Sequence, residues 1–197
     1  MTTTSGPTAA PIDLRVVPAG EVPWEDMATI FGTRGIGSRC FCQRYKLAAG
    51  EAFGNFPAEE RARRLDEQRG GLVAYDGEEP VGWCAVEPRS AYPGLVRVFT
   101  VPWKGRDEDR TDPSVWAVTC LFVRAGHRRQ GISGELARAA VEHARPRGAR
   151  ALEAYPMVTS AAIAEELHVG TVSTFADAGL TEVGRPTKRR AVMRIEL

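Results

Sequence analysis

The chain has 197 residues, which suits one domain with a sizeable core or two very small domains, and we expect one. Hydrophobic residues make up 43% of it and charged residues 26%, as in ordinary globular proteins, which excludes a largely disordered chain, a collagen and a coiled coil. The 26 Lys and Arg residues against 25 Asp and Glu residues leave a net charge of +1, so the overall field does not favour nucleic acid or an anionic membrane. Any anion binding must therefore be local.

The N-terminal residues, the apolar runs and the cysteines indicate the compartment. Residues 1–11 consist almost wholly of Thr, Ser, Gly, Pro and Ala, which predicts a disordered tail and not a signal peptide. The longest apolar run, Val115–Val123, is far shorter than the ~20 residues of a membrane-spanning helix. Four cysteines are too few for a disulfide framework, so we expect free thiols and a cytoplasmic protein.

The first third of the chain predicts a strand and two helices. Branched apolar residues favour a strand over Ile12–Pro18, and apolar residues at helical spacing favour a helix over Val22–Phe31. Residues 32–56 are rich in glycine and aromatic residues and have no clear period. Pro57–Gln68 has Pro early, Glu59 and Glu60 next, and Arg61, Arg63 and Arg64 after them, as a helix macrodipole favours, so a second helix is expected there.

The middle of the chain predicts a hairpin. Gly71–Asp76 and Pro80–Glu87 are apolar runs joined by a polar link with an Asp-Gly pair, which favours antiparallel pairing. We expect a further short strand over Leu95–Val101. Lys104–Pro113 is charged and aperiodic, and we expect a mobile loop there.

The C-terminal half predicts alternating strands and helices. Val115–Val123 is apolar almost throughout, which favours a central strand buried on both faces. Ile132–Arg145 carries an apolar helical stripe, and Ala151–Tyr155 follows as a strand. We expect a short helix over Gly170–Ala178 and a final strand over Ala191–Leu197, which alternates in polarity.

The turn between the central strand and the following helix concentrates residues that bind anions. A helix N-terminus presents unpaired N–H groups, and small residues let a phosphate approach them. The small residues and the possible charge-assisted donors of this turn are Gly131, Ser133 and Gly134, and Arg124, Arg128 and Arg129. A diphosphate would fit this combination, and the alternative is a solvated basic turn.

Other nucleotide motifs fit less well. The P-loop pattern of Gly, four residues and Gly-Lys-Ser/Thr is absent from the sequence. Residues 32–37 superficially resemble a dinucleotide fingerprint, but their glycine spacing is reversed and they follow a predicted helix instead of a strand. The arginine-containing turn is therefore the better candidate.

Two motifs resemble those of a known family. Residues 128–133, Arg-Arg-Gln-Gly-Ile-Ser, resemble the Arg/Gln-x-x-Gly-x-Gly/Ala signature of the GCN5-related N-acetyltransferases (GNAT). Ser133 stands where the family usually has Gly or Ala, which is a small change. Residues 175–180 resemble the family's Tyr-x-x-x-Gly-Phe ending, and order and spacing agree from Ile12 to Leu197.

The resemblance implies the fold. It implies an α/β (α+β) domain over residues 12–197, with a mixed, mostly antiparallel sheet of six or seven strands flanked by helices. The fourth and fifth strands, Val115–Val123 and Ala151–Tyr155, would splay apart and hold acyl-CoA in the gap.

The resemblance also implies a set of cofactor-binding residues. Main-chain groups of Leu121 and Val123 would bind pantetheine, residues 128–133 would wrap the pyrophosphate, and Arg124 and Arg129 would reach the outer phosphates. The full set is Leu121, Val123, Arg124, Arg128, Arg129, Gln130, Gly131, Ile132, Ser133, Gly134 and Phe175. The acceptor would lie across the gap, near Trp83, Glu87, Glu153 and Tyr155.

The sequence leaves the catalytic groups open between alternatives. Phe175 stands where many members have a Tyr that protonates the leaving thiolate, so either Tyr155 replaces it or no side chain does. A base must deprotonate the acceptor amine, and Glu153 is the first candidate with His168 second. The alternatives are a structural ion pair for Glu153 and a surface helix cap for His168.

The cysteines give weak support for a metal. Cys40 and Cys42 are separated by one residue without a second such pair, whereas zinc ligand pairs are normally two to four residues apart, so we expect no metal. Cys42 or Cys120 would instead face the acyl site. Residues 32–56 resemble the family's variable acceptor-binding segment, and the Cys-x-Cys and Glu-x-Tyr-Pro patterns are similar to those of a poorly assigned branch.

The expected function is transfer of an acetyl group from acetyl-CoA, or another acyl group from its acyl-CoA, to a primary amine of a small molecule by direct attack in a ternary complex. The alternatives are a protein lysine or N-terminal acetyltransferase, and a CoA-binding sensor without catalysis, for which Phe175 is the only indication. We expect no nucleic-acid or membrane partner, and a homodimer is left open.

Overall fold

The computed structural model describes residues 14–158, 161–163 and 166–197. Its sheet has seven strands in the order β1-β2-β3-β4-β5-β7-β6, and every neighbouring pair is antiparallel except β4 with β5. The strands are β1 (Leu14–Pro18), β2 (Leu72–Asp76), β3 (Glu79–Pro88), β4 (Val115–Val123), β5 (Ala151–Ala154), β6 (Thr181–Thr187) and β7 (Arg190–Glu196). The mixed sheet of six or seven strands is therefore confirmed.

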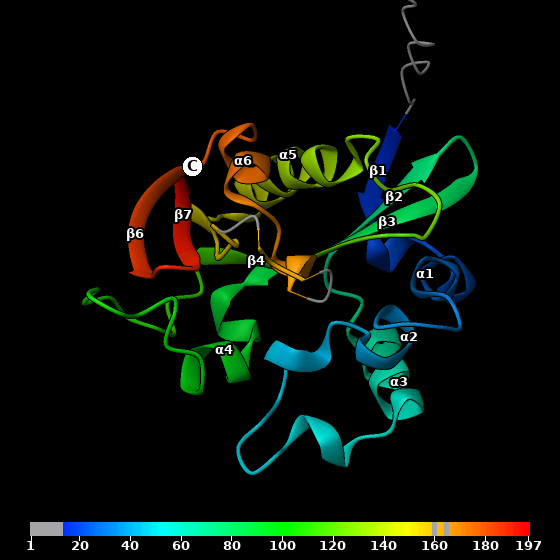
Figure 1. Cartoon of the computed structure of the whole chain (residues 1–197), viewed down its shortest axis with the longest axis horizontal. Coiled ribbons are helices and arrows are strands. Elements are labelled where there is room, and N and C mark those ends of the chain that lie inside the picture. Colours follow the sequence, from blue (N-terminus) through cyan, green and yellow to red (C-terminus); the bar gives the residue numbers. More distant parts are fainter. Residues whose placement is uncertain (1–13, 159–160, 164–165) are drawn as a thin grey trace, which may run out of the picture.

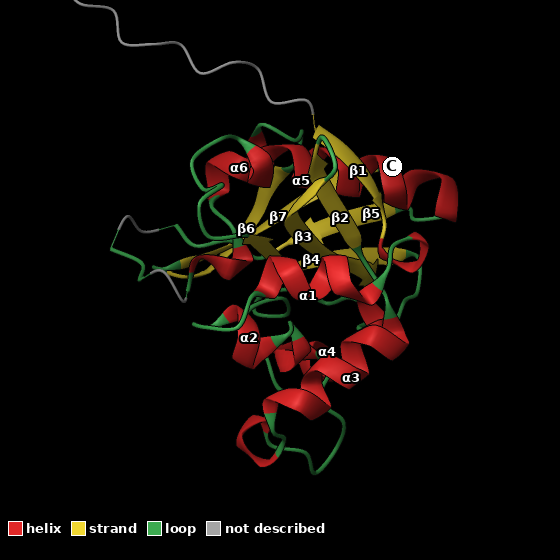
Figure 2. Cartoon of the chain, turned by 90° about the vertical axis from the view of Figure 1, so that its right-hand side faces the viewer, coloured by secondary structure: helices red, strands yellow, loops and turns green. Residues whose placement is uncertain are grey.

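Helices cover both faces of this sheet. The α-helices are α1 (Trp24–Phe31), α2 (Gly37–Cys40), α3 (Ala58–Gln68), α4 (Pro93–Arg97), α5 (Ile132–Ala144) and α6 (Val172–Ala176). Short 3₁₀ helices are η1 (Ala19–Glu21), η2 (Gln43–Tyr45), η3 (Phe53–Asn55), η4 (Arg89–Ala91), η5 (Arg145–Arg147) and η6 (Leu167–Val169). Figure 2 shows α5 and α6 on one side of the sheet and α1 to α4 on the other.

The central strand β4 divides the core into two parts. Val118 and Leu121 belong to the apolar cluster beneath α5, whereas Cys120 belongs to the cluster on the face that carries α1. Figure 1 shows β4 crossing the middle of the molecule between these layers. No helix in the described ranges is both long enough and apolar enough to span a membrane.

The strand predicted over Leu95–Val101 was wrong. The chain forms α4 there, with Pro93 at its start, and continues without regular structure. Proline is favoured in a first helical turn because its missing N–H would have no helical partner there. Leu95 is buried, and its carbonyl accepts a hydrogen bond of 3.2 Å from the indole of Trp103. The apolar residues of this segment therefore pack a turn and do not form a strand.

The edge strand β6 was not predicted. Its residues are mostly exposed, and it contains Gly184 and Pro186, which both weaken a strand pattern. The other predicted elements are present within one to three residues of their expected ends. The expected tail over residues 1–11 lies outside the described residues.

Candidate active site

The turn between β4 and α5 leaves the helix N-terminus open. Gly126, Arg129 and Gly131 adopt left-handed conformations with φ of +95°, +63° and +84°. Gly131 is the N-cap of α5, and no side chain accepts a hydrogen bond from the helix there. The first N–H groups of α5 are therefore left without a side-chain cap, and such a terminus binds anions.

A groove runs from this turn to α6 and encloses about 690 Å³. Its lining residues are Val123, His127, Arg129, Gly131, Ile132, Ser133, Gly134, Arg138, Ser173, Thr174 and Asp177. A Cβ placed on Gly131 would have open space around it, so a phosphate can approach the main chain at this point. Arg129 is exposed beside it, and these residues fit the diphosphate of an acyl-CoA.

The structure separates the predicted cofactor-binding residues into two groups. Those that line the groove are Val123, Arg129, Gly131, Ile132, Ser133 and Gly134. Leu121 and Phe175 are buried in the core beneath α5, and Phe175 is completely inaccessible. Arg124 and Arg128 line a different groove, and Gln130 is exposed to solvent. The side chains of these five residues therefore lie outside the groove, whereas the role expected of Leu121 involves its main chain.

The fourth and fifth strands separate as predicted. Val115–Val118 of β4 pair in parallel with Ala151–Ala154 of β5, and β5 ends there while β4 continues to Val123. Beyond this point η6 lies beside β4. In the part of the chain that the structure describes, residues 119–123 thus have a strand neighbour on the β3 side only.

A β-bulge in β4 determines which side chains reach the next cavity. Cys120 and Val118 pair with successive residues of β3, so Thr119 has no residue opposite it. Because strand side chains alternate between faces, one extra residue changes the alternation. Val118 and Leu121 thus face α5, whereas Thr119 and Cys120 both line a cavity on the opposite face.

That cavity is lined mainly by apolar surface. Its walls come from α1, α2, η2, β4 and η6, and the lining residues are Phe31, Ile36, Gly37, Cys40, Cys42, Arg44, Tyr45, Thr119, Cys120, Phe122 and His168. None of these described lining residues carries a carboxylate. A compact and largely apolar ligand fits such a space.

Two thiols meet in the wall of the apolar cavity. The Cys42 thiol donates to Sγ of Cys120 over 2.8 Å. Burial and the neighbouring Cys120 raise the pKa of Cys42 well above its ordinary value, and burial also raises the pKa of Cys40. All four cysteines are free, as expected. Among the residues described, no group of three or more His, Cys, Asp or Glu side chains is arranged to hold a metal ion.

Glu153 lies in a buried cluster of arginines and not in the cavity. Its carboxylate is 2.7 Å from Nη1 of Arg194 and 3.3 Å from Nη1 of Arg89, and Arg106 also donates to it. Burial raises the pKa of this carboxyl, but the hydrogen bonds and charges of its partners outweigh burial and lower the pKa overall. A fully buried carboxylate with a lowered pKa is a poor base, so the geometry favours the structural ion pair.

Tyr155 belongs to the same buried cluster as Glu153. Its side chain lies on the same face as Glu153, as the strand period predicts, and its hydroxyl donates to Glu153 over 2.8 Å. Burial and the Glu153 charge raise the pKa of Tyr155 well above its ordinary value. Neither side chain lines the apolar cavity. Tyr155 follows the last residue of β5 and packs in the same apolar cluster as the cavity-lining Tyr45.

The remaining residues expected near the acceptor do not line the apolar cavity, except His168. Trp83 is completely buried beneath the cavity, and Glu87 forms an ion pair of 2.5 Å with Lys46 outside it. His168 is the predicted catalytic residue that the structure brings to the apolar cavity, where its ring lies 6.5 Å from that of Tyr45.

The sequence of this chain matches a known protein family. Residues 38–168 match the family model described as the Acetyltransferase (GNAT) family. The chain belongs to the GNAT family. The matched range contains the residues of β4 that line the groove and the apolar cavity. It also contains the turn before α5 and His168. No curated protein matches the sequence.

Solved structures of low sequence identity share the GNAT fold. A GCN5-related N-acetyltransferase from Kribbella flavida is 18% identical, with a TM-score of 0.51 over 93% of this chain and 98% of that one. An N-acetyltransferase from Staphylococcus aureus Mu50 is 12% identical, with a TM-score of 0.53 over 93% and 98%. The yncA protein of Salmonella typhimurium, solved with its cofactor acetyl-CoA, is 13% identical, with a TM-score of 0.52 over 93% and 94%.

Sequence reasoning missed part of the apolar cavity. Thr119 and Phe122 line this cavity, but neither belongs to a motif with a recognisable spacing. The bulge that turns Thr119 toward the cavity cannot be recognised in the sequence of β4. A run of nine residues without a turn residue is equally typical of a strand with uninterrupted pairing.

Proposed function

We propose that the chain is an acyl-CoA-dependent N-acyltransferase that transfers an acetyl group from acetyl-CoA to a primary amine of a small molecule. The observation that carries this proposal is the position of the two cavities. The groove at the open N-terminus of α5 and the apolar cavity meet β4 along residues 119–123, where its pairing with β5 has ended. We take residues 12–197 as one catalytic domain of a cytoplasmic protein.

Different residues of the groove would bind different parts of acetyl-CoA. Gly131 and the open N-terminus of α5 would accept the pyrophosphate, with Arg129 and Ser133 beside it. The main chain of Val123 would bond the pantetheine arm. When bound, acetyl-CoA supplies the activated acyl group, and direct attack by the amine needs no covalent enzyme intermediate.

The apolar cavity would hold the acceptor and supply the base that removes a proton from its amine. Phe31 and Phe122 exclude water from the cavity wall, which strengthens electrostatic interactions inside it. The imidazole of His168 would accept the proton from the amine, because a base is needed to make the amine nucleophilic at neutral pH. Phe175 cannot donate a proton, and Tyr155 donates to Glu153, so we propose that the thiolate departs without a side-chain acid.

The enclosure of the cavity favours a small acceptor. Residues of α1, α2, η2, β4 and η6 surround it, so a compact amine fits better than an extended polypeptide segment. A protein lysine or N-terminus would be the acceptor if peptides and not free amines supported turnover. Binding of acetyl-CoA without turnover of any amine would instead identify a sensor.

Thermal unfolding with and without acetyl-CoA tests the binding site. A ligand that binds only the folded state stabilises it by about 2.7 kcal/mol at a hundredfold excess over Kd, so acetyl-CoA should raise the Tm. Gly131→Glu should abolish this shift, because it places a carboxylate where the phosphate would approach. Turnover is followed in parallel as release of the CoA thiol with a panel of amines.

Gly148→Glu is the matched control. Gly148 has a φ of +80° at the other end of α5 and open space around its Cβ position, so both variants carry the same kind of backbone strain. Gly148→Glu should keep the full Tm shift with acetyl-CoA. A normal shift in Gly131→Glu would overturn the phosphate assignment.

A further inference from the structure

A third groove adjoins the apolar cavity. It encloses about 920 Å³ and shares a wall with the cavity, formed by Phe31, Ile36, Gly37 and Phe122. A Cβ on Gly37 would lie only 2.6 Å from Cζ of Phe122, so the missing side chain lets the ring lie against α2 between the two spaces. The apolar cavity, here the inner cavity, and this outer groove therefore adjoin each other across the Phe122 ring.

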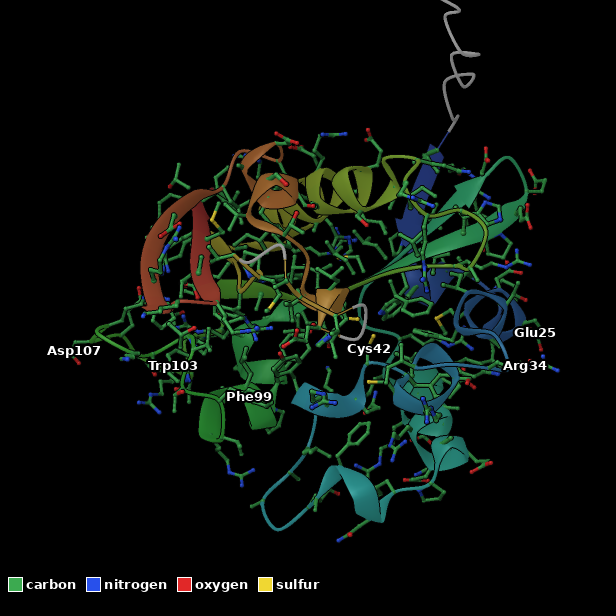
Figure 3. The ribbon with its side chains drawn as sticks, in the orientation of Figure 1. Glu25, Arg34, Cys42, Phe99, Trp103 and Asp107 are labelled. Carbon is green, nitrogen blue, oxygen red and sulfur yellow. The ribbon has the colours of Figure 1, made fainter. Side chains whose placement is uncertain are left out.

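The outer groove is basic. Arg34, Arg124 and Arg128 line it, and no acidic residue does among the residues described. Arg124 is compensated by Glu79 over 2.6 Å, but Arg34 and Arg128 are exposed and form no ion pair with a described residue. Figure 3 shows Arg34 at the solvent edge of the molecule. A concave surface lined by charges of one sign concentrates ligands of the opposite sign.

The inner cavity has the same sign. Its one permanent charge is that of Arg44, which likewise forms no ion pair within the described ranges, and its polar atoms otherwise come from thiols, Thr119, Tyr45 and His168. Figure 3 places Cys42 in the interior of the molecule. An acceptor with a second ammonium group would find no carboxylate in either space to compensate it.

We infer that the acceptor is a small amine whose far end carries an anionic group, either a carboxylate or a phosphate. The inference rests on the proposed function and specifies its substrate class. The apolar body and its amine would occupy the inner cavity beside Cys120 and His168, and the anionic end would reach Arg34 and Arg128. A guanidinium pairs with carboxylate and phosphate alike, through two parallel hydrogen bonds.

A series of benzylamines that differ only in the para substituent tests this charge selection. The substituents are hydrogen, carboxylate, methylphosphonate and aminomethyl, which give a neutral, two anionic and a cationic far end. We expect kcat/KM to be about tenfold higher for an anionic compound than for benzylamine, as for a charge-assisted hydrogen bond. The aminomethyl compound should be the poorest acceptor. Comparison of carboxylate with phosphonate identifies which anion is preferred.

Two variants locate the charge selection in the outer groove. Arg34→Gln and Arg128→Gln should each lower kcat/KM for the preferred anionic compound more than for benzylamine, and Arg34→Gln should leave the KM for acetyl-CoA unchanged. Arg145→Gln is the control, because Arg145 is an exposed arginine of η5 that lines neither space. The preference should also weaken at high ionic strength.

Equal kcat/KM for anionic and neutral compounds, preference for the cationic one, or an unchanged preference in both variants would overturn the inference. Failure of the proposed function is distinguishable from this. If the proposed function fails, acetyl-CoA gives no Tm shift or no compound is acetylated. Calorimetry then measures whether the protein binds the same series of compounds, which tests the charge selection without turnover. Binding of the anionic compounds that Arg34→Gln and Arg128→Gln weaken supports it, and equal binding of the whole series overturns it.

Discussion

Glu153 shows how the partners of one residue decide its role. The carboxylate is completely buried, and the guanidinium groups of Arg89, Arg106 and Arg194 surround it, with Tyr155 as a fourth donor. Removing water from a carboxylate is unfavourable unless donors replace that water. This carboxylate has such donors on all sides, which suits a structural ion cluster and leaves no lone pair for a substrate proton.

Glu153→Gln should therefore impair stability more than catalysis. The variant leaves buried guanidinium charges uncompensated, and breaking a buried pair destabilises by about 3–5 kcal/mol. Urea unfolding measures this change in the free energy of unfolding. Glu196→Gln is the control, because Glu196 also pairs with Arg194 but is mostly exposed, and it should change stability by less than ~1 kcal/mol. A stable Glu153→Gln protein without turnover would restore Glu153 as the base.

The buried thiols should react slowly with alkylating reagents. Burial raises the pKa of Cys42 and of Cys84 well above the ordinary value, and the thiolate is the reactive form. These two thiols therefore stay protonated near neutral pH, and their alkylation by iodoacetamide should increase only at more alkaline pH. Cys40 is partly exposed and should react first. Peptide mass spectrometry measures the rates, and a Cys84 rate equal to that in the urea-unfolded chain would contradict the prediction.

At the scale of elements, the position of α5 depends on close contact with β3. A Cβ placed on Gly82 would lie 2.8 Å from Cγ2 of Ile132 and 3.0 Å from Cδ1 of Leu136. Ile132 is the first residue of α5, so the helix end that borders the groove beside Gly131 rests directly on this glycine. The contact connects the packing of the sheet to the geometry of the site.

Gly82→Ala should move the N-terminus of α5. The added methyl group overpacks a closed contact, which destabilises by about 1–3 kcal/mol, and the shifted helix should bind acetyl-CoA more weakly. Urea unfolding and the Tm shift with acetyl-CoA measure the two effects. Gly20→Ala is the control, because a Cβ there meets nothing within 4 Å and its φ is not left-handed. Unchanged stability and an unchanged ligand shift in Gly82→Ala would show that the helix accommodates the methyl group.

At the scale of the whole molecule, the Glu153 cluster joins distant segments on one face of the sheet. Glu108 lies in the loop after α4 and pairs with Arg194 of β7 and with Arg89 of η4. Glu153, which lies in β5, also pairs with Arg194. Burial raises the pKa of Glu108, but hydrogen bonding to Arg89 and the surrounding cations lower it overall. Lowered pKa values of this kind link the stability of the fold to pH.

Acid should therefore destabilise the protein through this cluster. Both carboxyl groups have lower pKa values when folded than the value of about 4.3 in an unfolded chain, so their stabilisation is complete above that pH. It is lost as pH falls through the folded pKa values. Urea midpoints measured from pH 7 to pH 3 should be nearly constant above pH ~5 and fall below pH ~4. Glu153→Gln should show a shallower fall, and an identical slope would exclude Glu153 as a contributor.

Local patterns predicted much of the fold, because they act between neighbours in the chain. The Asp76-Gly77 pair predicted the β2–β3 hairpin, and helical spacing predicted α5. Leu95–Val101 misled because an apolar run of that length is compatible with a strand or with a packed turn, and the contact of Leu95 with Trp103 decides between them. The Thr119 bulge could not be predicted, because it is a mismatch of register between two strands.

The sequence by itself determined the family, the buried central strand and the glycine-containing turn before α5, because each depends on residues that are adjacent or regularly spaced. Only the tertiary structure decided which side chains share a cavity. It assigned Glu153 to arginines from three other segments and His168 to the cavity of Cys42 and Cys120. The physical reason is that burial and charge compensation are properties of the assembled surroundings, and residues far apart in the chain supply those surroundings.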